Sequence, residues 1–271
     1  MLSLSRVGAA ALCAAALLGS AGAEAQGVED WRYRAALYGY FPSIGATTTF
    51  PGTGGGGGVS VDAADILDSL EFAFMATFEA KKGLWGVYSD LVYFNVGNTK
   101  TQSRSLSLGD QGLPADVTAD VKLDMKSVQW MLAGTYQAVA TPRYTLDLLV
   151  GARLLDVDAQ LDWTLGGNIG SVPLPDHAGS SSVGLSNWDA IVGVKGRAMF
   201  GDDGRWFVPY HFDVGAGESR LTWQAAVGLG YTYPWGDIVA AWRYLDYDMK
   251  SGTALESINF SGPAIAVGFR W

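Results

Sequence analysis

The chain has 271 residues and a formal net charge of −9, and this acidic balance argues against nucleic acid as a partner. It contains 36 Gly, 10 Trp, 12 Tyr and 11 Phe, a composition typical of membrane β-barrels with aromatic girdles. After the N-terminal segment, no apolar run reaches the roughly 18 residues that a membrane-spanning helix needs.

The first 25 residues have the features of a secretory signal peptide. Arg6 precedes the apolar run Val7–Leu18, which is too short to cross a bilayer, and Ala23-Glu24-Ala25 is a small-residue cleavage site. Cys13 is the only cysteine and lies in this segment, so the mature chain forms no disulfide. We expect residues 1–25 to be cleaved and residues 26–271 to form one barrel domain.

Ten segments alternate apolar and polar residues with the period of two that places successive side chains on opposite faces of a strand. In the first segment Trp31 and Leu37 point one way, and Arg32 and Arg34 point the other. The expected strands are Trp31–Phe41, Glu71–Lys82, Trp85–Val96, Thr118–Val139, Tyr144–Trp163, Asn187–Phe200, Arg205–Gly215, Leu221–Tyr233, Asp237–Met249 and Ile258–Trp271.

The connections between these strands are of two kinds. Short turns are expected at Lys82, Pro142, Asp202 and Trp235, whereas long loops are expected over 42–70, with a helical turn from Asp62, over 97–117 and over 164–185. Short periplasmic turns and longer external loops are typical of outer-membrane barrels, and an even number of strands places both termini in the periplasm. We predict an all-β, closed antiparallel transmembrane barrel of about ten strands, located in the cell outer membrane.

Aromatic residues concentrate at two heights along the predicted strands, as expected for belts at the two membrane–water interfaces. The periplasmic girdle would contain Trp31, Trp85, Tyr144, Trp206, Tyr233, Trp235 and Trp271. A second set, Trp130, Trp188, Trp223 and Trp242, would form the outer girdle.

The last strand ends on a terminal aromatic residue. Ile265, Val267, Phe269 and Trp271 share its apolar face, and Arg270 lies on the other face. This pattern resembles the closing strand of bacterial outer-membrane β-barrel proteins. In that class the C-terminal segment is also the assembly signal, which the resemblance assigns here to Phe269 and Trp271.

Four further blocks carry a family resemblance: GLWGVYSDLVYF from Gly83, PYHFDVGAGES from Pro209, LTWQAAVGLGY from Leu221 and WRYLDYD from Trp242. They resemble an uncharacterised family of bacterial outer-membrane β-barrel proteins. The resemblance implies the barrel fold but brings no known activity and no established functional residues.

Inward positions of the predicted barrel carry charges of both signs. Unpaired charge is costly in a narrow lumen, so we favour a cross-lumen network that holds the barrel shut, with Asp213 paired to Arg197 or Arg243. The alternative is a polar pore whose charges select solutes. The candidate network comprises Arg32, Arg34, Glu79, Asp90, Asp147, Arg153, Asp189, Lys195, Arg197, His211, Asp213, Arg243 and Arg270.

His211 and Asp213 share one face of a strand, and an imidazole beside a carboxylate can act as a general base. Omptin proteases are ten-stranded outer-membrane barrels that use carboxylates and a histidine in an open external cleft. His211 instead falls about mid-strand, and no Gly-x-Ser-x-Gly or His-Glu-x-x-His motif occurs. We therefore predict no catalytic residue, no metal and no cofactor.

Carboxylates alternate with apolar residues at the far ends of the fourth and fifth strands. We interpret this alternation as shifted in parity relative to the outward residues Trp130 and Leu154. The hypothesis is a hairpin that projects above the bilayer, with carboxylates that face solvent or bind divalent cations beside lipopolysaccharide. These residues are Asp120, Asp124, Asp156, Asp158 and Asp162.

Three functions remain open. We favour an integral outer-membrane barrel with a structural or surface-interaction role and no enzymatic activity. The alternatives are a porin-like channel for small solutes and, less favoured, a hydrolase. Expected partners are outer-membrane lipid, lipopolysaccharide and the barrel-assembly machinery, with small polar solutes added if the lumen is open.

Overall fold

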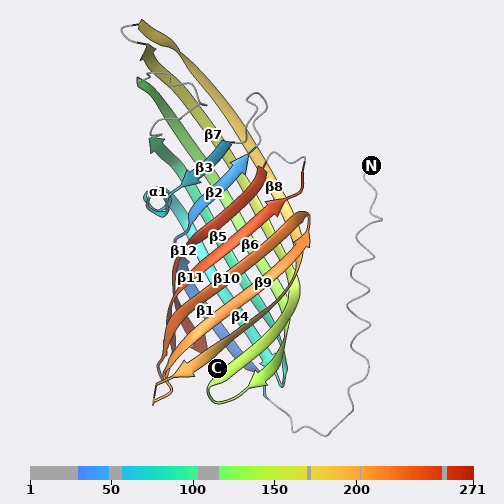
Figure 1. Ribbon diagram of the computed structural model, residues 1–271. Helices are drawn as coiled ribbons and strands as arrows, with labels where there is room; N and C mark the ends of the chain where they lie inside the picture. Colours follow the sequence, from blue (N-terminus) through green and yellow to red (C-terminus); the bar gives the residue numbers. More distant parts are fainter. Residues whose placement is uncertain (1–29, 49–56, 103–115, 170–171, 202, 252–254) are drawn as a thin grey trace. The chain divides into compact units, whose positions relative to one another are not determined.

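The computed structural model describes residues 30–48, 57–102, 116–169, 172–201, 203–251 and 255–271, which form an antiparallel β-barrel (Figure 1). The predicted signal peptide lies outside the described residues. The strands are β1 Arg32–Tyr40, β2 Ser43–Thr48, β3 Gly57–Val61, β4 Leu70–Lys82, β5 Trp85–Gln102, β6 Asp116–Ala140, β7 Tyr144–Ile169, β8 Val172–Phe200, β9 Trp206–Gly217, β10 Ser219–Thr232, β11 Gly236–Met249 and β12 Leu255–Arg270. The helix α1 spans Ala63–Asp68, and no helix among the described residues is long and apolar enough to cross a membrane.

The barrel closes through its first and last strands. Strands β1 and β4 to β12 pair antiparallel around the wall, and β1 also pairs with β12. The amide of Tyr33 donates to the carbonyl of Trp271 at 2.8 Å, and the amide of Trp271 donates back to the carbonyl of Tyr33 at 3.1 Å. The prediction of a closed antiparallel barrel of about ten strands is confirmed.

Strand β12 is long enough to pair with two segments. Its second half, Ala264–Arg270, pairs with β1, and its first half, Leu255–Ser261, pairs with β2. Strand β3 pairs with β2, and α1 contacts both β5 and β2. The helical turn expected from Asp62 is confirmed as α1, but the prediction of a loop throughout 42–70 is wrong for β2 and β3. Both segments are short and contain Gly, and the ladder of β12 supplies the partner that makes them extended.

Four strands run well past the others. Strands β5, β6, β7 and β8 have 18, 25, 26 and 29 residues, compared with about 9–11 residues for a strand that crosses a bilayer. Their far ends, coloured green to yellow, project beyond the rest of the barrel in Figure 1. The loop predicted over Thr164–Leu185 is wrong, because most of it continues β7 and β8. The loop predicted over 97–117 is likewise strand up to Gln102 and from Asp116.

Both faces of the wall change character along the barrel axis. At the end with the short turns, here called the short-turn end, outward side chains are apolar and inward side chains are charged, as in a lipid-embedded wall. Toward the opposite, far end the polarity reverses. On β11 the outward residues Ile238 and Trp242 are followed by Asp246, while the inward residue Arg243 is followed by Leu245. The far half is therefore built like a water-soluble barrel with its own apolar core.

Aromatic side chains surround the outer surface at the short-turn end. The seven residues predicted for this girdle are all exposed outward: Trp31, Trp85, Tyr144, Trp206, Tyr233, Trp235 and Trp271. Farther along the strands, Trp188 and Trp242 are exposed, whereas Trp130 and Trp223 are half-buried. Aromatic residues at two heights are expected where the wall crosses two membrane–water interfaces.

Deleting Trp271 should strongly reduce the amount of folded barrel. The deletion removes both backbone hydrogen bonds to Tyr33 and the ring stacking between these residues, whose centroids lie 5.9 Å apart. The measurement is the fraction of heat-modifiable, folded protein in outer-membrane preparations. Deleting Ser251, an exposed turn residue, is the control, and equal folded fractions for the two deletions would contradict an assembly role for Trp271.

Candidate functional site

The barrel interior has three layers, which follow from the order of inward side chains along each strand. The layer at the short-turn end is a polar cavity, here called the basic vestibule. A central layer of buried ion pairs lies above it. The far half contains an apolar core, here called the apolar plug.

Arg153 and Asp213 form the most deeply buried ion pair of the central layer. The Nη2 atom of Arg153 on β7 lies 2.6 Å and 2.7 Å from the two carboxylate oxygens of Asp213 on β9. The two side chains are only 2% and 0% exposed. Nε2 of His211 lies 2.7 Å from Oδ2 of Asp213, and Arg153 also donates to the hydroxyl of Thr222 at 3.3 Å. This cluster bridges over β8, the strand that lies between β7 and β9 in the sheet.

Arg243 organises a second cluster in the same layer. Its guanidinium donates to the carboxylate of Asp90 at 3.0 Å and to the hydroxyl of Tyr38 at 2.9 Å. The hydroxyl of Tyr38 in turn donates to Asp90 at 2.6 Å. Oε1 of Gln224 accepts from Arg243 at 2.9 Å and from Arg153 at 3.4 Å. Gln224 therefore links the two clusters into one hydrogen-bonded layer.

The apolar plug occupies the lumen beyond this layer. It contains buried side chains from β1, β4 to β7, β11 and β12, together with residues of β2 and α1. Because these side chains pack against one another, they exclude water from the far half of the lumen. The buried members are Tyr40, Ile44, Ile66, Met75, Val92, Phe94, Val96, Met125, Leu155, Val157, Leu245, Tyr247, Met249, Leu255, Ile258 and Phe260.

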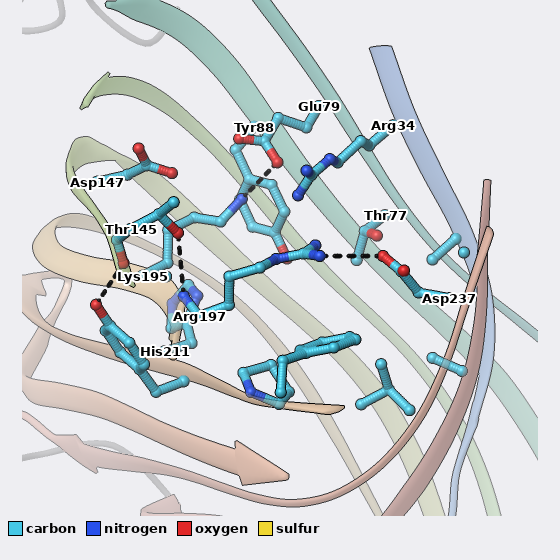
Figure 2. A pocket seen from close by; sticks show the side chains of 18 of the residues that line it. Arg34, Thr77, Glu79, Tyr88, Thr145, Asp147, Lys195, Arg197, His211 and Asp237 are labelled. Atoms are coloured by element: carbon cyan, nitrogen blue, oxygen red, sulfur yellow. Dashed lines mark hydrogen bonds and ion pairs between the residues drawn. The ribbon is translucent and has the colours of Figure 1, made fainter. Parts of the chain in front are cut away.

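The basic vestibule is a cavity of about 340 Å³ at the short-turn end. Figure 2 shows its charged side chains converging from several strands. Glu79 is bridged between Lys81 and Lys195, at 2.9 Å and 3.0 Å. Lys81 also contacts Asp147 at 2.5 Å, and the Nζ atom of Lys195 lies 3.7 Å from the ring centroid of Tyr88. These contacts span the lumen, because Glu79 and Lys81 lie on β4, whereas Asp147 and Lys195 lie on β7 and β8, three and four strands away in the sheet.

A separate group surrounds Asp237 on the other side of the vestibule. Arg197 lies 3.2 Å from its carboxylate, and Arg270 lies 3.5 Å away. The hydroxyl of Thr232 donates to the same carboxylate at 2.8 Å. The guanidinium of Arg197 also packs 4.6 Å from the ring centroid of Phe207. The carboxylate of Asp237 thus forms ion pairs with two arginines.

The structure places most of the thirteen candidate lumen residues in two of these layers. Arg32, Arg34, Glu79, Asp147, Lys195, Arg197 and His211 line the vestibule, and Arg270 lies beside it. Asp90, Arg153, Asp213 and Arg243 belong to the central layer. The expected pairing of Asp213 with Arg197 or Arg243 is wrong. Arg153 takes that place because the other two arginines bind Asp237 and Asp90.

Asp189 lies opposite Arg153 in the β7–β8 ladder but forms no ion pair with any residue that the structure describes. Its carboxylate accepts hydrogen bonds from the amide of Ser219 at 2.9 Å, from the Ser219 hydroxyl at 2.7 Å and from Asn187 at 2.7 Å. All three side chains are buried. Asp189 therefore anchors the connection between β9 and β10 to β8 and is a local structural group.

Asp237 and Gln224 also organise the network, although neither is among the thirteen predicted lumen residues. Asp237 shares its parity on β11 with Arg243, so the alternation already placed it inward. Its role as the partner of Arg197 and Arg270 depends on which strands face each other. Gln224 was recognisable as inward but carries no charge, and only the structure shows that it joins two ion pairs.

The predicted change of parity in β6 and β7 is wrong. Their register is continuous from Asp116↔Asn168 to Gln137↔Asp147, so no bulge separates the two parts of the hairpin. The same outward face changes from apolar to acidic, and Asp124 and Asp158 are exposed on it. Among the described residues, no group of three or more His, Cys, Asp or Glu is arranged to hold a metal ion.

The fold and the interior together define a class of protein. A closed antiparallel barrel with an even number of strands, an apolar outward band, aromatic girdles and a polar interior is the architecture of bacterial outer-membrane barrels. Short turns at one end and long strands at the other add to this pattern. The protein is an outer-membrane β-barrel protein.

Comparison with known proteins locates similar folds but no characterised relative. No known protein family matches the sequence, and no curated protein matches it. The outer-membrane protease OmpT of Escherichia coli is 13% identical, with 92% of this chain and 99% of that chain covered and a TM-score of 0.49. Ail, the attachment invasion locus protein of Yersinia pestis, is 10% identical, with 90% and 99% covered and a TM-score of 0.33. The translocator domain of the autotransporter NalP from Neisseria meningitidis is 13% identical, with 88% of each chain covered and a TM-score of 0.38.

Proposed function

We propose that this protein is an outer-membrane barrel with a closed lumen, whose role is structural or is to interact with other molecules at the cell surface, without enzymatic activity. In this proposal the short-turn end and both termini face the periplasm, and the far end stands above the outer leaflet. Its lipid-facing wall contacts outer-membrane lipid and lipopolysaccharide, and the barrel-assembly machinery inserts it.

The observation that carries the proposal is the closed central layer. Arg243 on β11 and Asp90 on β5 pair across the lumen at 3.0 Å with 10% and 5% exposure. Beside them Arg153 and Asp213 are 2% and 0% exposed. Directly above them the apolar plug begins with Leu155 and Leu245, both at 0% exposure. A hydrated solute would have to break the buried ion pairs of the central layer and then pass through a packed apolar core. Both steps are costly, which supports a plug over a channel.

The projecting sheet supports a role at the surface. Strand β7 has 26 residues, which at about 3.3 Å per residue span roughly 85 Å, far more than the ~30 Å hydrocarbon core. Its outward face at the far end carries exposed carboxylates, including Asp158. An acidic sheet of this length offers a large surface to partners outside the membrane.

The contacts of His211 favour a structural role over hydrolysis. Asp213, which could orient the imidazole, has both carboxylate oxygens within 2.7 Å of Arg153. The carboxylate is completely buried, and the histidine faces a cavity inside the barrel wall. In our proposal the His211–Asp213 pair is therefore part of the buried ion-pair network and has no catalytic role.

Planar-bilayer recordings test the closed lumen. The wild-type barrel is expected to show no stable unit conductance, because the central layer and the apolar plug block the path. Asp213→Asn should remain without conductance, since the plug is unchanged. A porin reconstituted in the same bilayers is the positive control. Stable wild-type conductance whose ion selectivity changes in Asp213→Asn would reject the closed lumen and favour the channel.

A further inference from the structure

We propose that the basic vestibule binds a small soluble oxyanion, with Arg34 as its principal contact. Arg197, on the facing wall, would complete the site. The proposal concerns only the cavity at the short-turn end. It holds whether or not the lumen is closed farther along the axis.

The vestibule concentrates positive charge within an acidic protein. Five basic side chains line it, at Arg32, Arg34, Lys81, Lys195 and Arg197. Only three carboxylates line it, at Glu79, Asp147 and Asp237. The whole chain, by contrast, has a formal net charge of −9. A cavity with an excess of positive charge and low-dielectric walls attracts anions.

The three carboxylates are already engaged by other cations. Glu79 and Asp147 contact the two lysines, and Asp237 contacts Arg197 and Arg270. The guanidinium of Arg34, in contrast, makes no hydrogen bond or ion pair within the described part of the chain, although Arg34 lines the cavity and is exposed. Its guanidinium therefore has all its donors available to a ligand.

The strand register places Arg34 between Arg270 and Glu79. In the β1–β12 ladder Arg34 lies directly opposite Arg270, and like charges at facing positions destabilise a sheet. In the β1–β4 ladder it lies opposite Glu79, whose carboxylate is already paired with Lys81 and Lys195. Figure 2 shows Arg34 and Arg197 extending from opposite walls toward the same space. An anion between Arg34 and Arg197 would offset the repulsion between their positive charges and accept hydrogen bonds from both guanidinium groups.

Size and chemistry indicate the class of ligand. A volume of about 340 Å³ lies at the lower end of the range of small-molecule sites, and it greatly exceeds the ~30 Å³ of one water. The planar fork of arginine matches the paired oxygens of phosphate and carboxylate groups. A lipid headgroup carries the same chemistry, but the hydrogen-bonded wall separates membrane lipid from the vestibule. The ligand we propose is therefore soluble.

The test is titration calorimetry with inorganic phosphate on the refolded barrel in a maltoside detergent, which contains no phosphate. Chloride at matched ionic strength is the control for general screening. Wild type should bind phosphate but not chloride. Arg34→Gln should bind phosphate about tenfold more weakly or worse, as expected from the loss of a charged hydrogen bond.

Two further variants complete the design. Arg143→Gln removes an exposed arginine that lies at the same end of the barrel but outside the cavity, and it should bind phosphate like wild type. Arg34→Lys keeps the charge and should retain part of the affinity. Equal phosphate affinity in wild type and Arg34→Gln would overturn the proposal, as would equal responses to phosphate and chloride. Neither result depends on conductance, so a failure here is distinguishable from a failure of the closed lumen.

Discussion

Replacing Asp213 by alanine should lower the free energy of unfolding by about 3–5 kcal/mol, because the substitution leaves a buried charge uncompensated. Arg153 would lose both carboxylate contacts, at 2.6 Å and 2.7 Å, while remaining 2% exposed. The neighbouring groups Thr222 and Gln224 can accept its hydrogen bonds but cannot neutralise its charge. The measurement is reversible urea unfolding in detergent micelles or lipid vesicles.

Two comparisons separate charge burial from a general effect of mutation. Asp203→Ala removes an exposed carboxylate that lies 3.9 Å from the Arg205 guanidinium and accepts a hydrogen bond from the Arg205 amide at 3.1 Å. This substitution should lower stability by only about 1 kcal/mol. The double variant Arg153→Met with Asp213→Leu should recover most of the loss, since replacing a buried pair by apolar side chains is often neutral or stabilising. If Asp213→Ala costs no more than Asp203→Ala, the central layer is hydrated and the lumen is not closed there.

Truncating Phe260 should be about as damaging as a core mutation in a soluble protein, with a loss of roughly 3–5 kcal/mol for Phe→Ala. Phe260 is 0% exposed within the apolar plug and packs near Phe94, with ring centroids 6.4 Å apart. Its removal leaves a cavity that neither water nor lipid fills favourably. Urea unfolding again reports the effect, and the slope of the transition should stay unchanged.

Phe212→Ala provides the matched control on the outer face of the wall. Phe212 is 47% exposed, and lipid or detergent chains can enter the space that it leaves. The variant loses the transfer free energy of the ring but not the cavity contribution, so it should be clearly less destabilising than Phe260→Ala. Equal losses of stability in the two variants, or a near-neutral Phe260→Ala, would show that the far half of the lumen is filled with water and has no apolar core.

Much of the architecture could be predicted because strand alternation is a local property. The sequence around Arg32 and Arg34 places both side chains on the face opposite Trp31 and Leu37, whatever the rest of the chain does. Repeated over ten segments, this pattern determined the number of strands in the closed barrel, the outward aromatic residues and the inward charges. Covalent geometry alone fixes such relations, so they can be derived without knowing which strands meet.

The partners inside the barrel were decided only by the tertiary structure. Asp213 pairs with Arg153, not with Arg197 or Arg243, because the stagger of the closed barrel sets the height at which each strand faces the others across the lumen. That stagger is a property of the whole sheet.

The far half shows the same division. The Gly- and Ser-rich segment from Thr164 to Leu185 gave no strand signal, yet most of it is extended, because a neighbouring strand satisfies its backbone hydrogen bonds. The reversal of polarity was visible at Asp124 and Asp158, but it was attributed to a shift in register. By itself the sequence determined which side chains share a face. Only the closed sheet decided which faces enclose a core and which charges meet, because both depend on contacts between residues far apart in the chain.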